Sequence, residues 1–350
     1  MKICSKYFIL SIVLSLFFNC QANIWDYRIS NEEAAQMTTE ADDYIDSIED
    51  GLQDREADAI LHALKFHPSE LKQFRELSSK AYFPVSDKVN EQELSIILPN
   101  EEAKGYLYSS KIKNNKRKRL LIFFHSGGLT MGGYQLTQGF CSNLASTGDI
   151  DVVSFDYPLL PEHSLSQIID YIDNIISYFI SNSKKFGVEK KNISIGGSGA
   201  GANLVLSSLL SIHETGKELS SIIKSVVLFY PVCNFNLDRT ESVRKYGRGY
   251  GFDYRLAEAF KAALTEEVAT DNGAIYESLS KIKMPPTLII TAERDILFDQ
   301  QTELIKNLKE NGFSVRDIIF EGSVHGFIED GAQKKAFNKA IELTESFLTE

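Results

Sequence analysis

The segment 193–204 constrains the fold of this chain more than any other part of the sequence. It reads Ile-Ser-Ile-Gly-Gly-Ser-Gly-Ala-Gly-Ala-Asn-Leu. Isoleucine at alternate positions predicts a strand that enters the segment, and leucines at helical spacing predict a helix that leaves it. The small residues between them predict a very tight turn, because only small side chains let a strand and a helix pass so closely.

A strand, a tight turn and a helix in this order are typical of a nucleophile elbow, where a serine occupies the tip of a strained turn. Two residues could be at the tip. If it is Ser198, then Ala200 stands where the motif prefers glycine. If it is Gly199, the flanking positions Gly197 and Gly201 are both glycine, but the nucleophilic side chain is missing. The segment alone leaves both alternatives open.

The rest of the chain predicts an α/β fold. Apolar runs typical of strands buried on both faces alternate with amphipathic helical patterns, which predicts a mostly parallel sheet with helices on both faces. The length of 350 residues suits one such domain with an appended helical cap. We predict a signal peptide, an N-terminal helical cap segment, a first part of the α/β core, a cap insertion and a second part of the core. Their respective residues are 1–22, 23–90, 91–232, 233–283 and 284–350.

The N-terminal segment has the pattern of a signal peptide. Lys2 and Lys6 precede a short apolar run, and Ala22 is a small residue at the expected cleavage point. This pattern predicts a secreted or periplasmic protein. A membrane anchor and a lipid on Cys20 are the alternatives. The run is short for a bilayer span, and no later run is long and apolar enough, so no stable membrane span is expected in the mature form.

Composition narrows the classes of ligand. The formal net charge of −11 argues against nucleic acid, whose phosphates would be repelled. The sequence has no Cys/His cluster with metal-ligand spacing, so we expect neither a metal nor a cofactor. Cys141 and Cys233 could form a disulfide, although two cysteines so far apart are more often separate buried side chains. No pattern indicates an oligomeric state.

An acidic residue and then a histidine follow later strands, which is the chain order of the partners of a nucleophile elbow. Asp295 ends a buried strand, and His325 follows the last strand in a glycine-flanked loop. Each has a plainer interpretation, as a helix cap and as a surface histidine. Their joint occurrence at strand ends favours an acid and a base. Gly127 and Gly128 follow another buried strand, where backbone N–H groups could form an oxyanion hole together with the N–H after the nucleophile.

The chain resembles the hormone-sensitive-lipase-like family of carboxylester hydrolases from about residue 94 to the C-terminus. Six further segments carry the resemblance: His125-Ser126-Gly127-Gly128, similar to the family's His-Gly-Gly-Gly, then Asp156-Tyr157-Pro158-Leu159-Leu160-Pro161-Glu162-His163, Tyr230-Pro231-Val232, Met284-Pro285-Pro286-Thr287, Thr291-Ala292-Glu293-Arg294-Asp295 and His325-Gly326-Phe327. The resemblance implies an α/β-hydrolase fold, with Asp295 and His325 as acid and base. It also implies that the N–H groups of Gly127, Gly128 and Ala200 bind the oxyanion, and that the two cap segments cover the substrate.

The elbow departs from the family pattern Gly-Asp-Ser-Ala-Gly. Aligned without gaps, Ser198 stands at the aspartate and Gly199 at the nucleophile. One hypothesis is an esterase for small or short-acyl esters that uses Ser198, which requires the turn to shift by one residue and would reverse the strand's side-chain alternation. The alternative is a catalytically silenced hydrolase fold that binds a small ester or carboxylate ligand.

Overall fold

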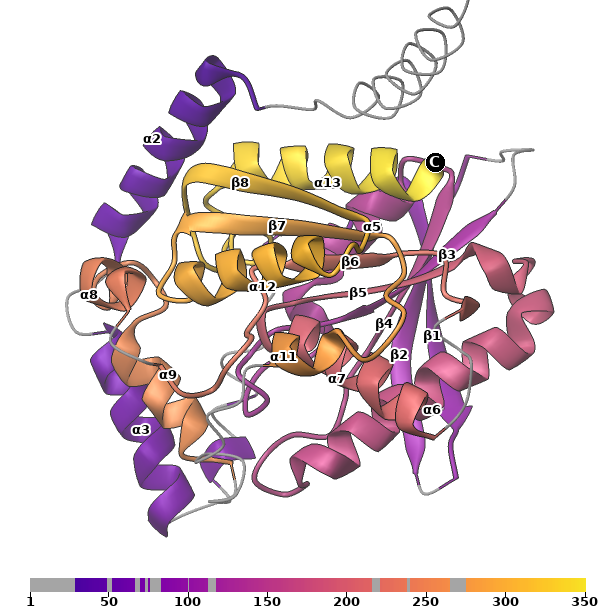
Figure 1. Cartoon of the computed structure of the whole chain (residues 1–350), viewed down its shortest axis with the longest axis horizontal. Helices are drawn as coiled ribbons and strands as arrows, with labels where there is room; N and C mark the ends of the chain where they lie inside the picture. Colours follow the sequence, from indigo (N-terminus) through magenta and orange to yellow (C-terminus); the bar gives the residue numbers. More distant parts are fainter. Residues whose placement is uncertain are drawn as a thin grey trace, which may run out of the picture.

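The computed structural model describes residues 29–48, 52–66, 70–72, 75, 83–99, 101–112, 118–215, 221–237, 240–264 and 275–350. The predicted signal peptide at residues 1–22 lies outside this part of the chain. Figure 1 shows a central sheet with helices packed around it. Across the described segments, no helix combines the length and the apolar character needed to cross a membrane.

Within the described ranges, eight strands form one mostly parallel sheet, which confirms the predicted α/β class. Their order is β1-β2-β4-β3-β5-β6-β7-β8. β1 pairs antiparallel with β2, and β2 with β4, while every later pair is parallel. The strands are β1 (Val89–Ile97), β2 (Glu102–Ser110), β3 (Arg119–Phe124), β4 (Ile150–Phe155), β5 (Ile193–Ser198), β6 (Val226–Phe229), β7 (Thr287–Arg294) and β8 (Val315–Val324).

Both faces of the sheet are buried, because successive strand side chains point to opposite sides. On β3, Leu120, Ile122 and Phe124 belong to one apolar cluster, whereas Leu121 and Phe123 belong to the other. The first cluster is covered by α6 (Leu165–Asn182), α7 (Gly199–Glu214) and α12 (Phe298–Glu310), and the second by α5 (Gln138–Ala145) and α13 (Lys334–Thr349).

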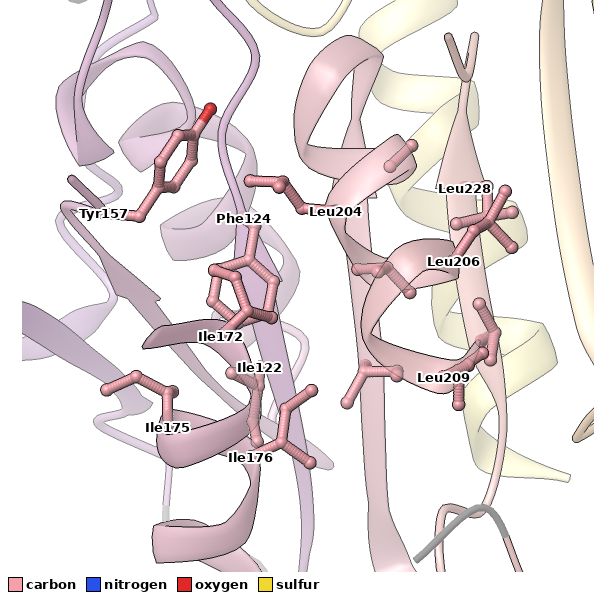
Figure 2. Close-up of a cluster of buried hydrophobic side chains, with 14 of the residues drawn as sticks. Ile122, Phe124, Tyr157, Ile172, Ile175, Ile176, Leu204, Leu206, Leu209 and Leu228 are labelled. Carbon is pink, nitrogen blue, oxygen red and sulfur yellow. The ribbon is translucent and has the colours of Figure 1, made fainter. Parts of the chain in front are cut away.

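Figure 2 shows part of the first cluster, where side chains of α6 and α7 meet those of the strands. Ile172 and Ile176 lie near Ile122 and Phe124 of β3, and Leu206 lies near Leu228 of β6. A capping box fixes the start of α6, since Ser164 and Gln167 each bind the other's backbone N–H. The apolar contacts of α7 with the strands hold this helix, which follows the elbow, firmly against the sheet.

The two predicted cap segments meet outside the sheet. In the N-terminal segment, α3 (Leu52–Phe66) packs on α9 (Tyr254–Lys261), and the two lie side by side in Figure 1. By contrast, α2 (Asn31–Ser47) packs along β8 and α13 of the core. The insertion also contains α8 (Glu241–Tyr246) and α11 (Ile275–Leu279). The predicted domain boundaries stay predictions. Of the helices named above, α3 and α9 pack on each other rather than on the sheet, so they are placed to cover a ligand site.

Parallel topology brings the chemically interesting residues together. His125 follows β3, Gly199 follows β5, Asp295 follows β7 and His325 follows β8. The carboxyl ends of parallel strands share one edge of the sheet, and ligands of open α/β sheets bind there. Cys141 and Cys233 are both buried and both free thiols, so they do not form the disulfide that the sequence allowed.

Candidate active site

Gly199 is the tip of the elbow. β5 ends at Ser198 and α7 begins at Gly199, whose φ of +50° lies in the left-handed region. A Cβ on Gly197 would lie 2.5 Å from the backbone carbon of Gly201, so the two flanking glycines touch. The backbone therefore follows the gapless alignment, in which Gly197 and Gly201 flank the tip, and the strand does not shift by one residue.

The close approach of Gly197 and Gly201 leads to a stability prediction. Gly197→Ala would place a methyl group within 2.8 Å of three backbone atoms, which cannot move aside as a flexible side chain can. We expect a loss of about 3 kcal/mol in the free energy of unfolding, measured by urea denaturation. Ser194→Ala, on the same strand, removes a hydrogen bond to Ser225 and should cost about 1 kcal/mol. Equal stability of Gly197→Ala and the wild type would contradict this account of the turn.

The Ser198 hydroxyl binds a carboxyl group instead of the predicted base. Ser198 is the last residue of the strand and is fully buried. Its hydroxyl donates a 2.6 Å hydrogen bond to Oε1 of Glu329. Ser198 stands at the position where the family has an aspartate, and there its hydroxyl binds the Glu329 carboxyl group. The Ser198 hydroxyl forms no hydrogen bond with His325.

Asp295 and His325 come together as predicted. His325 Nδ1 lies 2.7 Å from Asp295 Oδ2, and Asp295 is 1% exposed. The same carboxylate accepts hydrogen bonds from the Leu297 N–H and from Gln301 Nε2, both at 2.8 Å. These donors hold the carboxylate in place, so it can orient the imidazole and stabilise its charged form.

The other ring nitrogen of His325 faces the elbow. A Cβ built on Gly199 would lie 3.4 Å from His325 Nε2. Burial disfavours the charged imidazolium, but the charge and hydrogen bond of Asp295, with help from Glu329, outweigh it and raise the pKa of His325 above its usual value. The imidazole is therefore directed at the position where the family carries its nucleophile.

The predicted oxyanion loop has the required backbone shape. Gly127 and Gly128 adopt φ values of +107° and +61°, and the Met131 N–H donates to the Gly127 carbonyl at 2.8 Å. Buried His125 supports the loop, because its Nδ1 lies 2.6 Å from the Ser126 carbonyl. Burial lowers the pKa of His125 to about 4 despite this hydrogen bond, so its imidazole is neutral. Ala200 lies in the first turn of α7, next to the tip.

Aromatic side chains cover the site. The ring of Phe252 lies 4.7 Å from that of His325, and Phe252 is stacked with Phe260 of α9 at 6.3 Å. A Cβ on Gly128 would lie 2.2 Å from the Phe260 ring, so α9 rests directly on the oxyanion loop. Tyr230, at the end of β6, lies 4.7 Å from His325 on another side. The His325 side chain keeps 13% exposure, so access is narrow.

Glu329 is a residue of this site that the sequence did not point to. It is buried, and its N–H bonds the Gly326 carbonyl at 2.7 Å in the turn after His325. Burial raises the pKa of Glu329 to about 7, against the lowering effect of hydrogen bonds from Ser198 and Ser126 and of the nearby His325. The signal in the sequence was that Glu329 is an acidic residue four positions after His325. No group of three His, Cys, Asp or Glu side chains suited to a metal occurs within the described residues.

Comparisons with known proteins give the same fold. A family model described as alpha/beta hydrolase fold matches residues 121–329, which is more than half of the chain. A putative alpha/beta hydrolase of Acanthamoeba polyphaga mimivirus is 26% identical over 225 residues, which cover 61% of this chain and 62% of that protein. An arylesterase of Saccharolobus solfataricus is 27% identical over 278 residues, covering 77% of this chain and 87% of the relative.

Solved structures show the same fold. A thermostable esterase from Pseudomonas putida superposes with a TM-score of 0.72 at 19% identity, over 89% of this chain and 96% of that one. A Pyrobaculum calidifontis esterase gives a TM-score of 0.71 at 24% identity, over 82% and 96% of the two chains. The motifs, the sheet and these matches agree that the chain belongs to the hormone-sensitive-lipase-like family of carboxylesterases with the alpha/beta-hydrolase fold.

Proposed function

We propose that this protein hydrolyses small or short-acyl carboxylic esters, with His325 as the proton-transferring group and Asp295 as the residue that orients it. The observation that carries the proposal is the Asp295–His325 pair, 2.7 Å apart, whose free nitrogen is directed at the elbow tip. A carboxylate, an imidazole and an oxyanion loop converge on one point, as acyl transfer requires.

The backbone N–H groups of Gly127, Gly128 and Ala200 would stabilise the oxyanion of the tetrahedral intermediate. The preference for small esters follows from the cover, since Phe252 and Phe260 lie against His325 and the oxyanion loop. A long acyl chain would have to displace α9. No step is assigned to Ser198, because it is fully buried.

The second candidate function is a silenced hydrolase fold that binds a small ester or carboxylate. The observation that favours it is Gly199 itself, since glycine adopts a φ of +50° without the strain that a serine has there. In this case the Asp295–His325 pair would bind a ligand carboxylate or carbonyl without turning it over.

Hydrolysis of p-nitrophenyl acetate and butyrate separates the two functions. The proposed function predicts turnover by the wild type that falls to the level of buffer in His325→Ala and persists in Ser198→Ala. Turnover that is no higher in the wild type than in His325→Ala would reject hydrolysis of these esters. Saturable binding of butyrate, measured by calorimetry, would then favour the silenced alternative. Loss of turnover in Ser198→Ala, with an intact fold by circular dichroism, would contradict the assignment of no step to Ser198.

A further inference from the structure

Serine and glycine are exchanged between two positions that touch each other. The family's His-Gly-Gly-Gly has glycine where this chain has Ser126, and the family's elbow has serine where this chain has Gly199. A Cβ on Gly199 would lie 3.2 Å from the Cβ of Ser126. The Ser126 side chain thus lies beside the place that an elbow serine would fill.

Ser126 shares this place with the base. The point 3.2 Å from Ser126 Cβ is also 3.4 Å from His325 Nε2, so both groups border the same small volume. Ser126 keeps 8% exposure, whereas Ser198 has none. Of the two serines next to the tip, Ser126 is therefore the more accessible.

The Glu329 carboxyl group lies close to the Ser126 side chain. Its hydrogen bond comes from Ser198, and Ser126 is near enough to help lower its pKa. A hydroxyl beside a carboxylate has a path for its proton. The Gly127 N–H directly follows Ser126, and an N–H after the nucleophile is a usual oxyanion donor in this fold.

We propose that Ser126, on the oxyanion loop, is the nucleophile of this protein, with Glu329 as its base and His325 as the acid for the leaving group. This inference rests on the proposed ester hydrolysis and names the residue that performs its covalent step. Ser126 thus takes the role that the family gives to a serine at the position of Gly199.

The reaction is balanced over two half-reactions. Ser126 Oγ forms a bond to the acyl carbon while its proton passes to the Glu329 carboxylate. The bond from the acyl carbon to the alkoxy oxygen breaks, and that oxygen takes a proton from His325 Nε2, releasing the alcohol. Water then attacks the acyl-serine and gives a proton to neutral His325. The carboxylic acid leaves as Ser126 Oγ takes back the proton from Glu329, so both groups return to their starting forms.

This cycle predicts how the rate depends on pH. Glu329 must be ionised to accept the proton, and burial raises the pKa of its carboxyl to about 7. Hydrolysis should therefore fall as the pH drops through about 7. The charged or titratable groups that face Glu329 are His325, Asp330, Tyr157 and Tyr230. In Glu329→Gln, kcat should decrease and this acid limb should disappear. An acid limb that keeps its midpoint in Glu329→Gln would show that Glu329 is not the base.

Fluorophosphonate labelling with peptide mapping tests the nucleophile. We expect the adduct on Ser126 in the wild type, no adduct in Ser126→Gly, and wild-type labelling in the control Ser194→Ala, which lies at the start of β5. Hydrolysis of p-nitrophenyl acetate should fall by about 10²-fold or more in Ser126→Gly. An adduct on Ser198, or no adduct under conditions that label the double variant Ser126→Gly/Gly199→Ser, would overturn the proposal.

Failure of this inference can be told apart from failure of the proposed function. Turnover that depends on His325 but is unchanged in Ser126→Gly would keep ester hydrolysis and overturn Ser126 as nucleophile, in favour of direct attack by water. A mapped adduct on Ser126 without turnover of either ester would support the nucleophile and reject hydrolysis of these substrates.

Discussion

Exchanging the two residues back, in Ser126→Gly/Gly199→Ser, is expected to move the fluorophosphonate adduct to residue 199 and to raise kcat/KM for p-nitrophenyl acetate by roughly 10³-fold. The Asp295–His325 pair already faces this position, because a Cβ added at residue 199 would lie 3.4 Å from His325 Nε2. A serine at the elbow would have its base, its orienting carboxylate and its oxyanion donors in the family arrangement. Its hydroxyl would need no further movement of the backbone.

The single variants serve as controls for this exchange. In Gly199→Ser alone, the new Cβ lies 3.2 Å from Ser126 Cβ, so the two side chains crowd each other. The left-handed φ adds a cost of about 1–2 kcal/mol for a residue with a side chain. We therefore expect a smaller gain in activity and a melting temperature lower by a few degrees. If the double variant folds but is no faster than the wild type, the oxyanion loop or the cover is not competent for hydrolysis.

Replacing the orienting carboxylate is expected to have the second large effect. Asp295→Asn keeps the size of the side chain but removes the charge that raises the pKa of His325. An amide at this place can also reverse the preferred tautomer of the imidazole, and the matching change in a serine protease, a worked case for this residue arrangement, costs about 10⁴-fold. We expect a decrease of roughly 10³- to 10⁴-fold in kcat/KM, measured with p-nitrophenyl acetate.

Asp317→Asn is the matched control, because Asp317 on β8 pairs with Lys309 near the surface and has no contact with the imidazole. It should retain wild-type kcat/KM. Because Asp295 is buried and accepts two other hydrogen bonds, its variant must also be checked for folding by circular dichroism. A folded Asp295→Asn protein with unchanged kcat/KM would show that His325 needs no orienting carboxylate.

The sequence predicted the fold well because the information was local and periodic. The alternation of buried strands and helices indicated the sheet, and the order of Asp295 and His325 indicated which strand ends would meet. The gapless alignment with the family pattern indicated Gly199 as the tip, although the segment alone left Ser198 open. These features depend on backbone sterics and hydrophobic period, which a single sequence displays directly.

Other parts of the site could not be predicted from the sequence. The contact between Ser126 and position 199 joins loops after two different strands, so no spacing in the chain reveals it. Glu329 is close to His325 in sequence, yet its turn toward Ser198 depends on tertiary packing. The position of α2 also differs from a simple cap, because its partners are β8 and α13 of the core.

The most direct test of the account is to trap the acyl group on the protein. The wild-type chain is mixed with p-nitrophenyl acetate, quenched in acid within the first turnovers and digested for mass spectrometry. The account predicts an acetyl group on Ser126 that is absent from Ser126→Gly. An acetyl group on Ser198, or His325-dependent hydrolysis with no acetylated serine at any time point, would contradict it.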